Sequence, residues 1–353
     1  MKDCRRAKIR FAVIGAGWRA QYYLRIAAAL KDVFEVSGVL CRSEVRCGEI
    51  SGLYGVPVTM EAEEIAAGEP DLVVVAVSKT SICEVTLEWA ARGFPVLCET
   101  PAAMSAKGAE QLKEAVAGGA HIAVAEQYAR YATLAAELEL VRRGLIGRPE
   151  YLYLSQAHDY HGASLIRAYL DLDESVAYEV VSDEIMLPTA QTLTRMEEYH
   201  YGVIVDKLRV LRKYRFAGGQ AAVYDFDSEQ YRSPIRSNLI RILGERGEMI
   251  NGEFHYLDEE NAPRLERLEV SVVPVRRDTL NPNFRLVREV EKICFQGEVL
   301  YEAHFGLCGL TEDETAIATM LWDMDRYVHG CGPNPYPVSK ALFDCEMAQM
   351  WRE

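Results

Sequence analysis

Three small residues near the N-terminus have the types and the spacing of a phosphate-binding turn. They form the pattern Gly15-x-Gly17-x-x-Ala20, which follows a β-branched run at residues 8–14 and precedes a helical pattern. The first glycine permits a tight bend, the second lets the backbone approach a pyrophosphate, and the small third residue lets the helix pack closely on the strand. Free N–H groups at the helix N-terminus then face the phosphates. The pattern predicts a dinucleotide site, and the alternative is a glycine turn with only a structural role.

The end of the second expected strand bears on the choice between NAD and NADP. An acidic residue at this point would hold the ribose 2′-hydroxyl of NAD. The sequence instead runs Leu40-Cys41-Arg42-Ser43, in which Arg42 can pair with a 2′-phosphate and Ser43 can donate a hydrogen bond to it. This favours NADP over NAD. The alternative is that Arg42 is a solvated surface charge or stacks on the adenine.

Four polar residues, His158-Asp159-Tyr160-His161, stand where a strand-like stretch gives way to a helical one. Imidazole titrates close to neutral pH, which suits a histidine at such a junction for proton transfer. Two histidines three positions apart can also share a metal ion, but no third ligand is evident from the sequence. We therefore expect no metal, and we place His158, Asp159 and Tyr160 in a substrate pocket beside His161.

In the first part of the chain, strands that alternate with helices are expected to position the glycine turn and Arg42. A nearly unbroken valine run at residues 71–77 is typical of a parallel strand buried on both faces. Such alternation predicts right-handed βαβ units in a doubly wound parallel sheet, which is an α/β Rossmann fold. Further strands are expected at 8–14, 34–40, 95–98 and 121–125, and helices at 20–30, 82–92 and 106–117.

After residue 150 the pattern changes, and strand-like runs dominate. Strands are expected at 150–158, 203–216, 221–226, 238–243, 268–275, 286–294 and 299–305, with a hairpin turn at 244–247 and helices at 161–170, 312–328 and 338–351. Thr311 and Glu314 have the spacing of a capping box at the start of a closing helix. The pattern predicts an α+β domain with a mostly antiparallel open sheet. We place a Rossmann NAD(P)-binding domain at 1–125 and a substrate and oligomerisation domain at 126–353.

At Cys98-Glu99-Thr100-Pro101 the chain resembles the Gfo/Idh/MocA family of oxidoreductases. Members show a glycine motif near the N-terminus, a valine-rich strand, and a strand that ends in Glu-Lys-Pro. The matching stretches here are 15–20, 71–77 and 99–101, together with 125–130 and 144–147. The resemblance covers nearly the whole chain and is strongest at residues 8–155. It implies a Rossmann domain followed by an open-sheet domain through which subunits associate, so a homodimer or homotetramer is expected.

The resemblance also implies a catalytic lysine and a catalytic histidine, and the chain departs from the family at the lysine. Thr100 occupies that position, and threonine carries no positive charge to stabilise a substrate alkoxide. His161 takes the histidine position, where it would accept the hydroxyl proton while hydride leaves for the nicotinamide. Lys79 follows the valine-rich strand, and we hypothesise that it restores the missing charge. The alternative is an ordinary solvated lysine.

The same resemblance implies which residues surround the cofactor. The pyrophosphate region is assigned to Gly15, Ala16, Gly17, Trp18 and Arg19, and the adenosine ribose to Cys41, Arg42 and Ser43. The nicotinamide side is assigned to Val77, Ser78, Lys79, Glu99, Thr100 and Gln127.

Composition narrows the classes of function. The 353 residues include 39 Lys and Arg and 53 Asp and Glu, a net charge of −14. A chain this acidic lacks the electrostatic footprint of a nucleic-acid binder and is repelled by anionic membranes. The 9 scattered cysteines contain no C-x-x-C pair, which suits reduced thiols, and no signal-peptide pattern follows the charged residues 1–10. A cytoplasmic location is therefore expected.

Together these features predict an NAD(P)-dependent oxidoreductase that transfers hydride between nicotinamide and a hydroxyl or carbonyl group. The expected substrate is a small polar molecule such as a sugar, a cyclitol or a derivative of one. Two alternatives remain open. One is a hydrolase or lyase that keeps NAD tightly bound and recycles its hydride, and the other is a non-catalytic protein that senses NAD(P).

Overall fold

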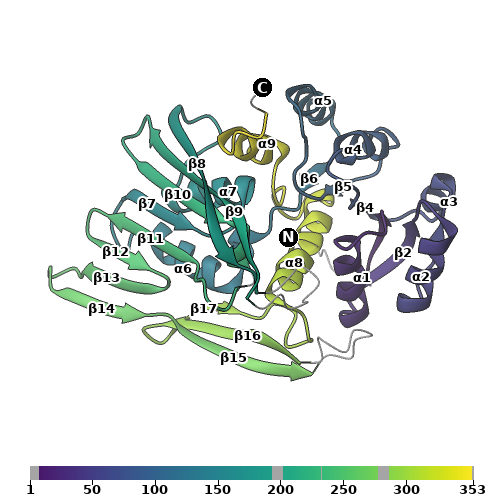
Figure 1. The fold of residues 1–353 in the computed structure, drawn as a ribbon. Coiled ribbons are helices and arrows are strands. Elements are labelled where there is room, and N and C mark those ends of the chain that lie inside the picture. The colour runs from purple at the N-terminus through teal and green to yellow at the C-terminus, as the bar shows by residue number, and fades with distance from the viewer. Residues whose placement is uncertain (1–7, 193–201, 232, 277–285, 352–353) are drawn as a thin grey trace.

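The computed structural model describes residues 8–192, 202–231, 233–276 and 286–351 (Figure 1). The charged residues 1–7 lie outside this described part. So do residues 193–201 and 277–285.

The N-terminal part of the chain folds into a six-stranded sheet in which every adjacent pair of strands is parallel. The strand order is β3-β2-β1-β4-β5-β6, so the order reverses between β1 and β4. Open α/β sheets bind ligands at the carboxyl ends of the strands beside such a reversal. The strands are β1 (Ile9–Ile14), β2 (Phe34–Leu40), β3 (Val58–Thr59), β4 (Leu72–Val75), β5 (Val96–Cys98) and β6 (Ile122–Val124). The connecting helices are α1 (Ala20–Ala29), α2 (Glu44–Tyr54), α3 (Ala62–Ala67), α4 (Ile82–Ala91) and α5 (Ala106–Ala117).

Side-chain alternation along the central strands explains why both faces of this sheet are covered. In β1, Phe11 and Val13 pack into one apolar cluster, whereas Ala12 and Ile14 pack into another on the opposite face. All four residues of β4 are buried, as the valine run predicts. The expected doubly wound α/β fold is confirmed.

The second part of the chain is built on a larger, mostly antiparallel sheet, which confirms the predicted fold class. Its strand order is β14-β13-β12-β11-β7-β10-β9-β8, and only β7 and β10 pair in parallel. The hairpin expected at 244–247 joins β11 and β12. The strands are β7 (Pro149–Ser155), β8 (Tyr178–Ala190), β9 (Ile204–Phe216), β10 (Ala221–Asp227), β11 (Leu239–Gly244), β12 (Gly247–Ile250), β13 (Glu253–Leu257) and β14 (Pro263–Arg267).

A short helical segment and one helix connect the two sheets, namely η1 (Tyr128–Arg130) and α6 (Ala132–Arg142). α7 (Asp159–Leu170) lies between β7 and β8 of the larger sheet. A second 3-10 turn, η2 (Ser228–Tyr231), follows β10. A smaller sheet is antiparallel and contains β15 (Glu269–Arg276), β16 (Leu286–Phe295) and β17 (Glu298–Glu302).

The two closing helices return to the N-terminal sheet (Figure 1). α8 (Glu312–Val328) begins with the predicted Thr311–Glu314 capping box, and its apolar face joins the cluster formed by β1 and α1. α9 (Val338–Met347) joins the cluster on the opposite face of the sheet. The sequence division at residue 125 stays a prediction, and the closing helices contribute to the core of the first domain as well.

The cysteines differ in one respect from the expectation of reduced thiols. Within the described residues, Cys41, Cys47, Cys83, Cys98, Cys294, Cys308 and Cys345 carry free thiols. Cys331 is disulfide-bonded, so the expectation is wrong at this position. None of the helices in the described ranges is long and apolar enough to cross a membrane.

Candidate active site

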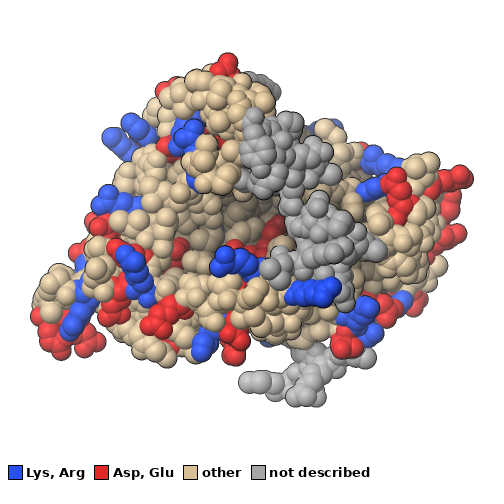
Figure 2. Space-filling view, turned by 60° about the horizontal axis from the view of Figure 1, so that its bottom comes forward, with Lys and Arg blue, Asp and Glu red and all other residues tan. Residues whose placement is uncertain are grey.

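A cavity of about 1250 Å³ lies between the carboxyl edge of the parallel sheet and the start of α7. Figure 2 shows the hollow, with acidic side chains at its depth. With the exception of Cys41, every residue assigned from the sequence to cofactor, substrate or catalysis lines this cavity. The fold therefore brings together five stretches that are separate in the sequence: the glycine turn, the end of β2, the loop after β4, the loop after β5, and the start of α7.

The glycine turn has the geometry that a phosphate-binding turn requires. Gly15 has a φ of +117°, and a Cβ on it would lie 2.4 Å from the carbonyl oxygen of Ala76. A Cβ on Gly17 would meet no protein atom within 4 Å, so the cavity is open on that side. Ala20 is completely buried, which lets α1 pack closely on the sheet. The first glycine is thus required by its backbone conformation, and the space beside the second is open.

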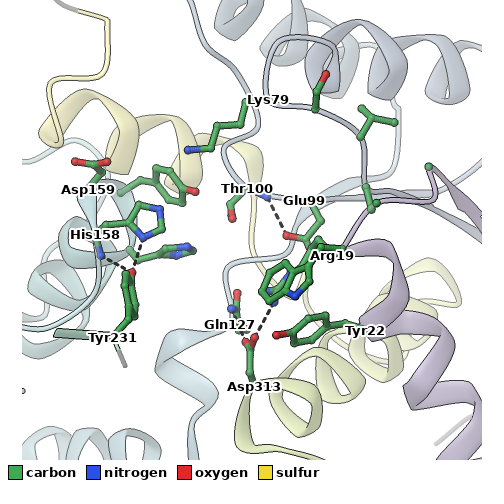
Figure 3. Close-up of a pocket in the computed structure, with 18 of the residues that line it drawn as sticks. Arg19, Tyr22, Lys79, Glu99, Thr100, Gln127, His158, Asp159, Tyr231 and Asp313 are labelled. Carbon is green, nitrogen blue, oxygen red and sulfur yellow. Dashed lines mark hydrogen bonds and ion pairs between the residues drawn. The ribbon is translucent and has the colours of Figure 1, made fainter. Parts of the chain in front are cut away.

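Arg19 was assigned to the pyrophosphate region, but its charge is already paired within the protein. Its Nε donates to Glu99 Oε1 at 2.8 Å, and its Nη1 donates to Asp313 Oδ2 at 2.7 Å (Figure 3). The Tyr23 hydroxyl also donates to Glu99 Oε1, at 2.6 Å. The guanidinium charge is therefore balanced within the protein by two carboxylates. One of them, Asp313, comes from α8 near the opposite end of the chain.

Asp313 is a site residue that the sequence analysis did not identify. Besides Arg19, its carboxylate accepts hydrogen bonds from Gln127 Nε2 at 2.7 Å and from the Tyr131 hydroxyl at 3.0 Å. Burial alone would raise the pKa of Asp313, but the Arg19 charge and these donors hold it below its ordinary value. The capping box locates the start of α8 in the sequence, but no sequence signal indicates that Asp313 faces the cavity.

At the adenosine end, α2 begins directly after the cavity-lining Arg42. Ser43 caps the helix, and its hydroxyl accepts the Arg46 amide at 3.4 Å. Arg46 Nε donates to the carbonyl oxygen of Ala16 at 2.7 Å, which ties the glycine turn to α2. Arg42 is exposed and makes no ion pair with any of the described residues. Its charge is therefore available to a bound anion.

Cys41 lies apart from the cavity, contrary to its assignment to the cofactor. Its side chain is 3% exposed and packs in the apolar cluster of β1, β2 and α1. Burial raises the pKa of the Cys41 thiol to about 12, so it stays protonated at neutral pH. The alternation of β2 continues through Cys41 and directs its side chain into the core, while Arg42 points to solvent.

At the other end of the cavity, His161 occupies the first turn of α7. Its Nδ1 lies 2.5 Å from Oε2 of Glu126, and both side chains are buried. The rings of Tyr128 and Tyr160 flank the imidazole, with centroids at 4.5 Å and 4.4 Å. Burial, reinforced by the Arg19 charge, lowers the pKa of His161, and burial raises the pKa of Glu126. Glu126 stands in a stretch that carries the family resemblance, but the sequence analysis gave it no role.

Lys79 and Thr100 face the same space from the loops after β4 and β5. Figure 3 shows the Lys79 side chain extending toward the gap between Thr100 and Asp159. Lys79 is exposed, and the described part of the chain offers it no ion-pair partner. The Thr100 amide donates to Glu99 Oε2 at 3.3 Å, and its hydroxyl interacts with the Tyr160 hydroxyl. The structure thus brings Lys79 to the side of the cavity where the family lysine is missing.

Two tyrosine hydroxyls accept hydrogen bonds from the backbone of the residues assigned to substrate binding. The Tyr231 hydroxyl accepts the His158 amide at 2.7 Å and also contacts Nδ1 of His158 (Figure 3). The Tyr224 hydroxyl accepts the Asp159 amide at 3.0 Å. A Cβ on Gly162 would lie 2.4 Å from the Tyr224 ring, so this glycine lets the ring pack against α7. Across the described ranges, no three His, Cys, Asp or Glu side chains are grouped as metal ligands.

Further residues also line the cavity: Tyr22, Arg46, Ala76, Tyr128, Tyr131, Gln191, Lys207, Ser228, Glu229, Tyr231 and Asp313. Most belong to the crossover after β6, to β9, or to the turn after β10.

Comparisons with known proteins agree with this geometry. Residues 9–126 match the GFO_IDH_MocA model, described as an oxidoreductase family with an NAD-binding Rossmann fold. The scyllo-inositol 2-dehydrogenase (NADP(+)) IolU of Bacillus subtilis (strain 168) is 32% identical over 106 residues, or 30% of this chain. The match spans about a third of that relative, 32% of its length.

Solved structures resemble the whole chain in fold. An oxidoreductase from Agrobacterium radiobacter, solved with NAD+, L-tartaric acid and magnesium, has a TM-score of 0.65 and 15% identity, covering 97% of this chain and 94% of that one. Biliverdin reductase from Synechocystis sp. PCC 6803, solved with biliverdin and NADP+, has a TM-score of 0.61 and 13% identity, covering 96% and 98%. Residues 9–126 therefore match an oxidoreductase family with an NAD-binding Rossmann fold, in agreement with the resemblance seen in the sequence.

Proposed function

We propose that this protein is an NAD(P)-dependent oxidoreductase that transfers hydride between nicotinamide and a hydroxyl or carbonyl group of a small polar substrate. The observation that supports this proposal is the single cavity that extends from the glycine turn at Gly15 to His161. A cavity of this size has room for a dinucleotide and a small substrate together. The relative named as a scyllo-inositol 2-dehydrogenase points to a cyclitol or sugar as the substrate.

In this proposal the glycine turn holds the pyrophosphate, and Thr100, Lys79 and His161 surround the reacting carbon. When bound, the nicotinamide supplies the hydride acceptor or donor. His161 takes the proton of the substrate hydroxyl during oxidation and returns it during reduction. The Lys79 ammonium stabilises negative charge on the substrate oxygen, which Thr100 cannot do.

The proposal favours NADP over NAD. No carboxylate follows β2 where NAD would need one, and Arg42 is exposed on the cavity wall with no ion-pair partner among the described residues. The N-terminus of α2 adds free N–H groups and a favourable dipole for a 2′-phosphate.

The test is absorbance at 340 nm with NADP+ or NAD+ and a panel of cyclitols and aldoses, comparing the wild type with His161→Ala. Net formation of reduced cofactor that disappears in His161→Ala is the expected result. Product formation without net reduced cofactor would instead indicate a hydrolase or lyase that recycles its hydride. Cofactor binding without turnover on any substrate would indicate a sensor.

We also propose that the subunits associate through the outer strands β8 and β9 as a homodimer or homotetramer. These strands expose apolar side chains on one face of the sheet, with Ile204 of β9 at 61% and Met186 of β8 at 57%. A patch of this kind marks an interaction surface. Light scattering after size exclusion should show an oligomer, and Met186→Glu combined with Ile204→Lys should reduce its mass. A monomeric wild type would contradict this proposal.

A further inference from the structure

Glu126 and His161 form a hydrogen bond between two buried side chains. Glu126 follows β6 and His161 lies in α7, so two separate elements bring the two groups to 2.5 Å. The exposed fractions of the two side chains are 4% and 7%. At this distance a single proton lies between Nδ1 and the carboxylate oxygen, and it belongs to either the ring or the carboxyl group.

The surroundings determine which member of the pair gains a proton when one arrives. Burial and the Arg19 charge oppose an imidazolium at His161, although Asp313, Glu99 and Asp159 act in the opposite direction. Burial favours the protonated form of Glu126, against the charges of Arg167 and Arg19 and hydrogen bonds from Ser164 and the Tyr128 amide. The Asp344 carboxylate, which interacts with Glu126 by charge, also favours the protonated form of Glu126. The other side chains around the pair are Tyr128, His158, Tyr160, Tyr231, Tyr336 and Cys345. Protonation of the carboxyl group, with the ring left neutral, is the favoured outcome.

We propose that Glu126 is a positioning residue that holds His161 with its proton on Nδ1 and receives that proton when Nε2 takes one from the substrate. This inference rests on the proposed oxidoreductase function. During oxidation, the C–H bond breaks and its electron pair goes with the hydrogen to NAD(P)+, while the substrate C–O bond becomes a carbonyl. The hydroxyl proton moves to Nε2, and the Nδ1 proton moves to Glu126 Oε2. Reduction reverses each step, so no buried imidazolium forms in either direction.

The chain contains a matched control for a buried carboxyl group. Glu137 of α6 is also buried, and it accepts a hydrogen bond from the Tyr169 hydroxyl. Burial raises the pKa of Glu137 as well, but this residue does not line the cavity. Glu137→Gln therefore removes a buried carboxyl group without touching the proton path.

The first experiment measures the pH dependence of turnover in wild type, Glu126→Gln and Glu137→Gln. The rate of oxidation by the wild type should rise with pH as Glu126 ionises, and the rate of reduction should fall over the same pH range. A glutamine keeps a hydrogen bond to Nδ1 but cannot take the proton, so Glu126→Gln should lose at least about 100-fold in turnover and lose this pH response. Glu137→Gln should keep the wild-type response. Wild-type rates and pH response in Glu126→Gln would overturn the inference.

The second experiment needs no turnover and separates this inference from the proposed function. Nitrogen NMR of histidine in the cofactor-free protein reports which ring nitrogen carries the proton, and a His161→Gln spectrum identifies the signal. As the pH falls, the wild-type proton should move from Nδ1 to Nε2 while the ring stays neutral, and this switch should vanish in Glu126→Gln. Formation of an imidazolium in its place would overturn the inference. If Glu126→Gln does not fold, Glu126→Asp should retain the switch. A protein that shows the switch but oxidises no substrate refutes the proposed function alone.

Discussion

The guanidinium of Arg19 and the carboxylate of Asp313 form an ion pair at 2.7 Å across 294 positions of the chain. This pair joins the glycine turn to α8, whose apolar face packs in the same cluster as α1. The nucleotide end of the cavity is thus positioned by a C-terminal helix as well as by the βαβ units around it. The closing segment of the chain is part of the cofactor-binding domain in structural terms.

Replacing Asp313 should weaken this connection in a pH-dependent way. Asp313→Asn should lower the free energy of unfolding at pH 7 by about 1–2 kcal/mol, because Arg19 loses one of its two carboxylates in a partly buried site. The folded-state pKa of Asp313 lies below its ordinary value, so its contribution is complete above about pH 4 and is lost as the pH falls further. Urea unfolding at pH 7 and near pH 3 should therefore show a difference that shrinks in acid. The exposed Asp32→Asn serves as the control, and an equal loss at both pH values would contradict the assignment.

The two glycines of the turn should respond differently to alanine. Gly15→Ala places a Cβ 2.4 Å from the Ala76 carbonyl at a positive φ, so it should cost about 2–4 kcal/mol in stability. Gly17→Ala meets no protein atom, so its unfolding should match the wild type while its affinity for NADP+ falls. Thermal unfolding and calorimetric titration measure the two effects. Unchanged cofactor affinity in Gly17→Ala would show that the pyrophosphate binds elsewhere.

Arg42 should determine the preference for NADP. Arg42→Ala removes a charged hydrogen-bond donor from the 2′-phosphate, which is equivalent to about 1.5–3 kcal/mol, or roughly 10- to 100-fold in NADPH affinity. Affinity for NADH should stay the same, because NADH has no group at that position. Fluorescence titration with both cofactors tests this, with the exposed Lys31→Ala as a control. Equal losses for both cofactors would mean that Arg42 contacts the adenine instead.

Lys79 should supply the positive charge that Thr100 lacks. Lys79→Ala should lower kcat by at least about 10-fold, since a charge near the substrate oxygen is lost. Adding Thr100→Lys to this variant should restore part of the rate by returning a lysine to the family position. The exposed Lys107→Ala should have no effect on kcat. A Lys79→Ala enzyme with normal turnover and normal cofactor affinity would leave Lys79 as a solvated surface residue.

The features that could be predicted from the sequence are those that depend on the local backbone conformation or on the burial of a single strand. Gly15 is recognisable because its backbone conformation and its close approach to β4 are needed in every such turn. The valine run of β4 is recognisable because a strand buried on both faces needs apolar residues throughout. His161 was predicted from the family resemblance and from its place where a strand-like stretch gives way to a helical one, and it lines the cavity.

The partners of these residues depend on tertiary packing and were not predictable. Glu126 meets His161 across 35 positions, and Asp313 meets Gln127 across 186. No local pattern encodes such pairs. The strand β8 was also missed, because its partly polar sequence is held extended by the register of β9. Cys41 was assigned to the cofactor but lies outside the cavity. Neighbouring side chains of a strand point to opposite sides, so Cys41 and Arg42 face different ways.

A crystal structure with NADP+ bound is the most direct test of the central claim that one cavity unites the dinucleotide with His161. We expect the 2′-phosphate at Arg42, the pyrophosphate over Gly17, and nicotinamide C4 facing Nε2 of His161 across the space for one substrate carbon. A nicotinamide ring turned away from His161, with Glu126 and His161 out of reach of any substrate oxygen at C4, would contradict it.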